Sequence, residues 1–232
     1  MPLRSQGEKV HTYRHCLAKK VVSFSLLAML FLLGACSSAY YNTMEKFGVH
    51  KRDIVVERVT KARDAQTDAK EQFKTALEQF SEVIEVQGGD LEKKYNSLNR
   101  EYEKSKAEAE LVHERIQSVE NVSEALFQEW QKELGEYSSA TLRRDSEQKL
   151  KETRYQYERL IAAMKRAEDK IDPVLSVFHD QVLYLKHNLN AQAIASLQGE
   201  RIHLEKNVAQ LVKEMEESIR EADQFISHLN QN

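Results

Sequence analysis

Apolar residues recur every three or four positions along most of the chain beyond residue 50, a spacing typical of amphipathic helices. The first run lies between Gly48 and Gly88, and eight of its nine positions are apolar. Its members are Val55, Val59, Ala62, Gln66, Ala69, Phe73, Ala76, Phe80 and Val83. Val56, Leu77 and Ile84 widen this stripe on one side, which favours a bundle of several helices over a two-stranded coiled coil.

The longest regular run follows Asp90. Thirteen positions keep the same spacing: Leu91, Tyr95, Leu98, Tyr102, Ser105, Ala109, Val112, Ile116, Val119, Ser123, Leu126, Trp130 and Glu133. A helix of about 45 residues is roughly 65–70 Å long, which exceeds the diameter of a compact domain, so we expect a rod. Before it, Gly88 and Gly89 predict a C-terminal glycine cap, and Asp90 predicts an N-cap.

Turn-forming residues divide the rest of the chain. Residues 135–141 predict a turn in which Ser138, Ser139 or Thr141 can cap the next helix. That helix places Leu150, Tyr157, Leu160, Met164, Ala167 and Ile171 inward. At Asp172-Pro173 either a new helix begins, with Asp172 as its N-cap, or one helix is kinked. The inward positions then resume one residue out of step, at Leu175, Phe178, Val182, Leu185 and Leu189, which favours a break or bend at the proline.

Gly199 is expected to end this helix. A last run follows at Leu204, Val208, Leu211, Met215, Ala222, Phe225 and Leu229. Long helices joined by short turns pack as antiparallel neighbours. We therefore predict an all-α fold over residues 51–232, an elongated antiparallel helical bundle or a set of coiled-coil hairpins. Composition agrees, because the 232 residues include only 7 Gly and 2 Pro, whereas Ala, Glu, Lys, Arg and Leu make up 106.

The segment before residue 36 has a different character. Basic residues precede an uncharged run of 13 residues, Val21–Leu33, which at roughly 20 Å is too short to cross a bilayer core of about 30 Å. The sequence Leu33-Gly34-Ala35-Cys36 follows and resembles the lipobox of bacterial lipoproteins. The resemblance implies a signal peptide over residues 1–35 that is cleaved, and a tether over residues 36–50. An ordinary signal peptide and an uncleaved short anchor remain alternatives.

The lipobox resemblance implies that Cys36 carries acyl chains, palmitate among them, which hold the protein on a membrane. Ser37, rather than Asp, follows this cysteine, and by the same resemblance favours the periplasmic face of the outer membrane. Cleavage would remove Cys16, so the mature chain has no disulfide. It has 29 basic and 36 acidic residues, a net charge of −7, which argues against nucleic-acid binding through a basic face.

Two Glu-x-x-His sequences, Glu110–His113 and Glu200–His203, raise the question of a di-iron site of the ferritin-like kind. The heptad register argues against it, because at least Glu110 and His203 fall on solvent-facing positions. His179 and His187 lie eight residues apart without a third ligand nearby, which is weak support for a metal site. No phosphate loop, nucleophile elbow or Cys-x-x-Cys occurs, so we expect no enzyme activity, no metal and no cofactor.

Uncharged amides stand out between residues 184 and 199. Asn188, Asn190 and Gln192 can set helix register through buried hydrogen bonds or form a surface for a partner. Three aromatic residues, Trp130, Tyr137 and Tyr155, are open to two interpretations as well: core residues or interface anchors.

Three segments of the helical region, residues 124–130, 160–164 and 185–197, together with the lipobox, resemble an uncharacterised bacterial lipoprotein group, domain-of-unknown-function family 2959. The resemblance covers nearly all of the mature chain and implies a Gram-negative envelope protein, but it supplies no catalytic or binding residues. We expect a lipid-anchored periplasmic protein that presents long helices to an unknown envelope protein, and self-association stays open. The alternative is a helical-bundle module that binds a small ligand or a metal near residues 188–192.

Overall fold

The computed structural model describes residues 50–85, 90–188 and 190–231. The lipobox cysteine Cys36, the predicted signal peptide and most of the predicted tether lie outside these residues, as do Gly88, Gly89 and Leu189. The chain divides into two units at Lys51, and the following concerns the second, residues 51–232. It contains α2 (Lys51–Glu85), α3 (Leu91–Glu133), α4 (Ala140–Glu168), α5 (Ile171–His187) and α6 (Ala191–Gln231), which confirms the predicted all-α bundle.

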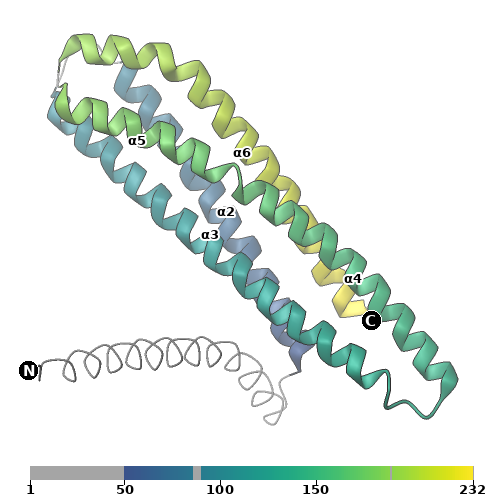
Figure 1. The fold of residues 1–232 in the computed structure, drawn as a ribbon. Helices are drawn as coiled ribbons and strands as arrows, with labels where there is room; N and C mark the ends of the chain where they lie inside the picture. Colours follow the sequence, from purple (N-terminus) through teal and green to yellow (C-terminus); the bar gives the residue numbers. More distant parts are fainter. Residues whose placement is uncertain (1–49, 86–89, 189, 232) are drawn as a thin grey trace, which may run out of the picture. The chain divides into compact units, whose positions relative to one another are not determined.

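The helices form an antiparallel bundle with four legs (Figure 1). α4 and α5 follow one another along the same leg, while α2, α3 and α6 each make one leg alone. α2 packs against α3 and α6, and the α4–α5 leg packs against the same two helices from the other side. The 43 residues of α3 make a helix about 65 Å long, so this unit is a rod.

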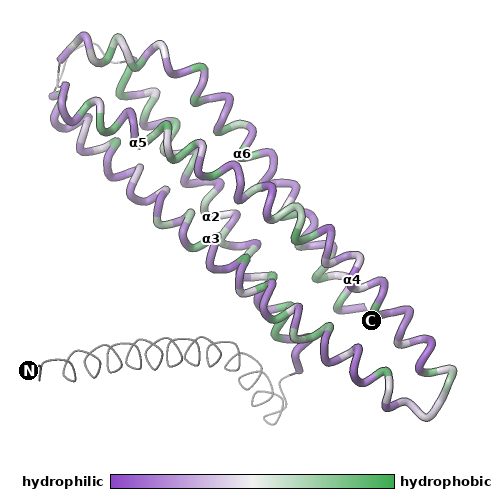
Figure 2. The backbone as a smooth tube through the Cα atoms, in the orientation of Figure 1, coloured by the Kyte–Doolittle hydropathy of each residue, from purple (hydrophilic) through white to green (hydrophobic). Residues whose placement is uncertain are grey.

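The core consists of the predicted stripes. All nine positions of the first stripe, from Val55 to Val83, are buried, including the polar Gln66. Figure 2 shows hydrophobic and hydrophilic residues alternating at helical intervals along each leg. Phe73, Phe80, Phe178 and Phe225 are among the largest fully buried side chains. Each such ring stabilises the fold by about 1.5–3 kcal/mol relative to an exposed one.

The expected shift of register at Pro173 is wrong. The predicted inward positions Phe178, Val182 and Leu185 are buried. The main seam of the α4–α5 leg nevertheless keeps an unbroken spacing across the proline: Leu160, Met164, Ala167, Ile171, Val174, Phe178, Gln181 and Leu185. Val174, not Leu175, faces the core, and the polar Gln181 fills a position that an apolar search overlooks. A two-residue turn, Asp169-Lys170, separates the helices, so Pro173 lies in the first turn of α5, where no backbone N–H is needed.

Gly199 does not end a helix, contrary to expectation. It lies inside α6, on the exposed side, where a Cβ would meet no other atom within 4 Å. A helical glycine costs only about 1 kcal/mol relative to alanine, and the buried residues that flank it, Leu197 and Leu204, stabilise the helix. The break comes earlier, at Asn188, whose backbone leaves the helical region with φ −132° and ψ 60°.

A polar pair interrupts the apolar core between α2 and α6. Ser218 donates a hydrogen bond of 2.6 Å to the side-chain oxygen of Gln66, and both side chains are fully buried. The bond satisfies the Gln66 side-chain oxygen and links α6 to α2 at this level, whereas Gln66 Nε2 finds no hydrogen-bond partner among the described residues. The buried amide that links two helices thus lies in the first stripe, whereas Asn190 and Gln192 are exposed and Asn188 is only half-buried.

The two ends of the rod are built differently. At one end Asp90 caps α3 by accepting a hydrogen bond from Lys93 N, as predicted. At the other end Ser139 caps α4 by accepting from Leu142 N. The start of α2 is held on α3 by the Lys51 ammonium, 2.8 Å from Glu129. The α3–α4 turn lies beyond both the start of α2 and the end of α6 (Figure 1), so residues 131–150 form a projecting two-helix segment, the hairpin tip.

Candidate partner-binding surfaces

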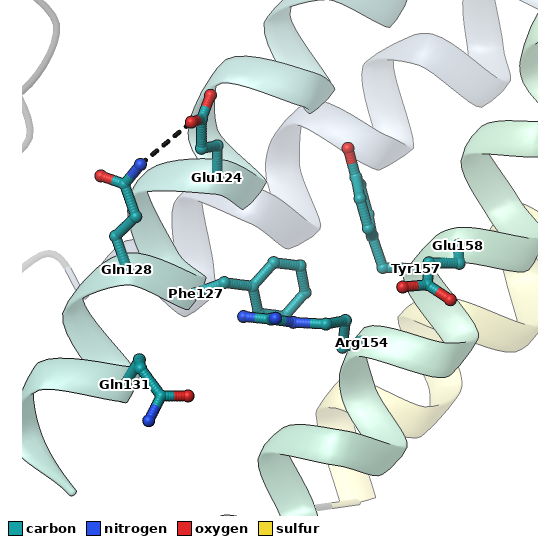
Figure 3. Close-up of a pocket in the computed structure, with 7 residues that line it drawn as sticks. All are labelled: Glu124, Phe127, Gln128, Gln131, Arg154, Tyr157 and Glu158. Atoms are coloured by element: carbon teal, nitrogen blue, oxygen red, sulfur yellow. Dashed lines mark hydrogen bonds between the residues drawn. The ribbon is translucent and has the colours of Figure 1, made fainter.

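A groove runs between α3 and α4 in the half of the rod that begins at Lys51 (Figure 3). Its volume is about 520 Å³. α3 contributes residues spaced by three and four, the spacing of one helix face, and α4 contributes a matching set. The lining residues are Glu124, Phe127, Gln128 and Gln131 from α3, with Arg154, Tyr157 and Glu158 from α4.

Aromatic rings form the floor of this groove. The Phe127 and Tyr157 rings meet edge to face, with centroids 5.3 Å apart, and the Arg154 guanidinium lies 5.2 Å from the centre of the Phe127 ring (Figure 3). A cation over a ring face is attracted by the ring's negative face. Burial, and then the charges of Glu120 and Glu124, raise the pKa of Tyr157 to about 12. At neutral pH the phenol carries its proton, as an ordinary tyrosine does, and can donate a hydrogen bond.

Charged and amide groups line the edges of the groove. Glu124 accepts a hydrogen bond of 2.9 Å from Gln128, and Glu158 lies on the α4 side beside Arg154 and Tyr157 (Figure 3). Apolar rings below, with carboxylates, amides and one guanidinium above, match the apolar and polar faces of an amphipathic helix. The seven lining residues include two carboxylates, one phenol, two amides, one guanidinium and one phenyl ring.

The sequence did not identify this groove, although part of its signal was present. Phe127 and Leu134 lie off the main stripe of α3, and both are buried, in one cluster with Leu150. A second apolar line on one helix indicates a second packing partner, here α4. The width of the groove depends on how far apart α3 and α4 lie, which periodicity does not report.

A smaller groove of about 200 Å³ lies where α2 begins, and Trp130 lines it. Trp130 is half-buried and donates a hydrogen bond of 2.8 Å from Nε1 to Ser146 Oγ, so it belongs to the packing of α3 against α4. The other two aromatic candidates do not behave as core residues. Tyr137 is 42% exposed and Tyr155 is 60% exposed, so the interpretation of this pair as core is wrong.

The three amides of the predicted partner surface lie at the opposite end of the rod, where α5 gives way to α6 (Figure 1). Asn188 donates from Nδ2 to the Tyr184 carbonyl at 3.0 Å, and its own carbonyl accepts from Asn190 N at 2.9 Å. These bonds close the turn. Asn190 and Gln192 are exposed, and none of the grooves described here is lined by any of the three amides.

The candidate histidines His113, His179, His187 and His203 are all exposed. Glu110, His113, Glu200 and His203 are all exposed, which agrees with the heptad register. His113 Nδ1 lies 2.5 Å from Glu168, and the same carboxylate pairs with Lys165. These side chains line a third groove, of about 750 Å³, near the α4–α5 junction. His179 packs against the Tyr102 ring. Within the described residues, no three His, Cys, Asp or Glu side chains are grouped to hold a metal ion.

Comparison with known proteins identifies the family. In the described part of the chain, no helix has both the length and the apolar character needed to cross a bilayer. A search of curated proteins returns no significant match. The sequence model of the family described as "Protein of unknown function (DUF2959)" matches residues 40–229, which includes all five helices almost to the end of α6. The chain therefore belongs to this family.

Proposed function

We propose that this protein is a lipid-anchored structural and interaction protein of the bacterial envelope, whose rod presents the α3–α4 groove to a helix of a partner protein. The groove carries the proposal, because it offers an aromatic floor and polar edges along two parallel lines of side chains. A partner helix would place apolar residues at three-four spacing on Phe127 and Tyr157. Its polar residues would meet Arg154 and the two carboxylates at the edges.

Anchoring would determine how the rod is presented. Fifteen residues, Cys36 to His50, separate the lipidation site from α2, and they span at most about 50 Å. The Lys51 end of the rod would thus remain near the membrane, on its periplasmic side. We propose that this membrane is the outer membrane. The 35 residues of α2 extend about 50 Å, so the Asn188 turn lies about that far from the Lys51 end along the rod.

The anchor is tested by Cys36→Ser expressed in a Gram-negative host fed with labelled palmitate. We expect the wild-type chain to incorporate label and to fractionate with outer membranes, and the variant to incorporate none. Ser37→Ala, next to the acylated position, is the matched control and should retain the label. Label that persists in Cys36→Ser would refute lipidation at this residue.

The groove is tested by photo-crosslinking in cells. A photoreactive residue in place of Gln131 should trap a discrete partner, because Gln131 lines the groove. The same residue in place of Asp68, exposed on α2, should trap none, because α2 does not pack on α4. Adding Arg154→Glu should reduce the Gln131 product several-fold. Equal products from both positions would mean that the groove has no special role.

A second function, a module that binds a small ligand, is favoured by the volume of the same groove. About 520 Å³ lies within the roughly 300–1,000 Å³ of small-molecule pockets. Native mass spectrometry of the purified chain distinguishes the two functions. A stoichiometric non-protein mass that is lost in Arg154→Glu would favour the ligand module over the partner helix.

A further inference from the structure

The hairpin tip exposes apolar side chains that the rest of the rod does not cover. Leu142, in the first turn of α4, is 59% exposed, and Tyr137 in the adjoining turn is 42% exposed. Other side chains pack the inner side of the tip: Leu134 and Leu150 are buried there against Phe127. Leu142 therefore contributes little to the packing of the hairpin, while Tyr137 keeps part of its ring exposed and donates a hydrogen bond of 3.4 Å from its hydroxyl to Ser146 Oγ.

Basic residues follow directly on Leu142. Arg143 and Arg144 are exposed, and neither forms an ion pair with a described residue. Their position is unfavourable for the helix, because a helix N-terminus favours acidic residues and the first turn of α4 has none. The tip also has four acidic residues. Asp145 pairs with Lys149 at 3.4 Å and Glu147 with Lys151 at 3.2 Å, while Glu133 at the end of α3 and Glu136 in the turn are exposed.

The tip also lies at the end of the rod from which the rest of the chain leaves. Lys51, where α2 begins, contacts Glu129 on α3, about six residues before the α3–α4 turn. The turn therefore stands about 10 Å beyond that contact along the rod. A tether of at most about 50 Å keeps the tip at high effective concentration near any membrane that holds Cys36.

We infer that the hairpin tip docks on an anionic lipid surface, with Leu142 and Tyr137 at the level of the headgroups and Arg143 and Arg144 on the lipid phosphates. An exposed leucine and tyrosine beside two consecutive arginines have the chemistry of a membrane-interface contact. The inference rests on the proposed anchor, because an unanchored tip offers too few groups for stable binding. Docking would set the rod upright on the membrane.

The test uses fluorescence in the anchored chain, because Trp130 is the only tryptophan. Wild-type lipoprotein and its variants are purified from membranes and reconstituted into vesicles of phosphatidylethanolamine and phosphatidylglycerol. One variant combines Trp130→Phe with Leu142→Trp. The control combines Trp130→Phe with Ile202→Trp, because Ile202 is 77% exposed on α6, far from the tip.

The tryptophan at 142 should shift to shorter wavelength and lose about half or more of its emission to brominated lipids, while the tryptophan at 202 should do neither. Phosphatidylcholine vesicles, or added Arg143→Glu and Arg144→Glu, should abolish both effects. Identical behaviour at 142 and 202, whether both are quenched or neither, would overturn the inference. Failure of the anchor would be distinguishable, because the wild-type chain would then not float with the vesicles.

Discussion

Two regions of the rod differ in how many helices pack together. In the four-helix part, α2, α3, α6 and the α4–α5 leg lie side by side, whereas the hairpin tip contains only α3 and α4 with their turn. In the four-helix part every leg has two neighbours, and side chains such as Phe73 and Leu211 have no exposed surface. In the tip only α3 and α4 remain, and one small cluster around Leu134 and Leu150 holds them together. The same three-four spacing of apolar residues thus produces one region whose apolar side chains are buried and another in which some of them remain exposed.

The difference separates the part that holds the fold together from the part where we propose that binding occurs. Long apolar stripes on all four legs are used up in packing the core, although a polar groove of about 750 Å³ remains near the α4–α5 junction. The α3–α4 groove lies toward the Lys51 end, and the hairpin tip projects beyond it. We therefore expect substitutions in the four-helix part to act on folding, and those at the tip to act locally.

The largest effect is expected from Phe73→Ala in the four-helix part. Phe73 is fully buried, so its truncation should lower the free energy of unfolding by about 3–5 kcal/mol through lost burial and a cavity. Chemical denaturation followed by circular dichroism measures this loss. Phe73→Leu, which refills most of the volume, should cost far less. A loss below about 1 kcal/mol in Phe73→Ala would mean that this core can collapse around the gap.

A smaller and more local effect is expected from Leu150→Ala in the tip. Leu150 packs on Phe127 and Leu134, so we expect its loss to cost about 2–3 kcal/mol, mainly in local opening. Hydrogen exchange should therefore accelerate in residues 131–150 more than in α2. Leu142→Ala, at an exposed position of the same tip, should change stability by less than about 0.5 kcal/mol. Uniform acceleration in all helices would show that tip and rod unfold together.

Much of the four-helix part could be predicted from spacing alone, whereas the tip could not. The stripes on α2 and α6 predicted the buried faces, because an amphipathic period reports which side of a helix meets the core. The error at Gly199 arose because a glycine was expected to end the helix, whereas a glycine on the exposed face of a helix costs little stability. The error at Leu175 arose because only apolar residues were followed, whereas the seam continues through the amide Gln181. The projection of the tip depends on axial contacts such as Lys51 with Glu129, which join residues 78 positions apart.

Removing the buried hydrogen bond of the four-helix part should have an intermediate effect. Ser218→Ala leaves Gln66 fully buried without its partner, at an expected cost of about 1–2 kcal/mol. Adding Gln66→Met should restore most of the loss, because an apolar pair of similar volume needs no hydrogen bond. If adding Gln66→Met lowered the free energy of unfolding of Ser218→Ala further, the Gln66–Ser218 pair would stabilise the fold through its packing and not through its hydrogen bond. Equilibrium denaturation of the two single variants and the double variant provides this comparison.

The smallest effect is expected at Glu101, a buried carboxylate on α3. Burial would raise its pKa, but hydrogen bonds from Gln72 at 3.0 Å and Lys104 at 2.9 Å outweigh burial and hold the pKa below 4.5. A lowered pKa in the folded state means that the charge stabilises the fold above pH 4.5, and that this contribution is lost as the pH falls through the folded-state pKa. Glu101→Gln should thus be less stable than wild type by about 1 kcal/mol or less at pH 7. This difference in stability between wild type and Glu101→Gln should disappear in acid. Unfolding midpoints measured across pH test this. Glu103→Gln, on the exposed face, is the control for the loss of one charge. A gap that stayed constant down to low pH would show that the amide disturbs packing around Gln72 instead.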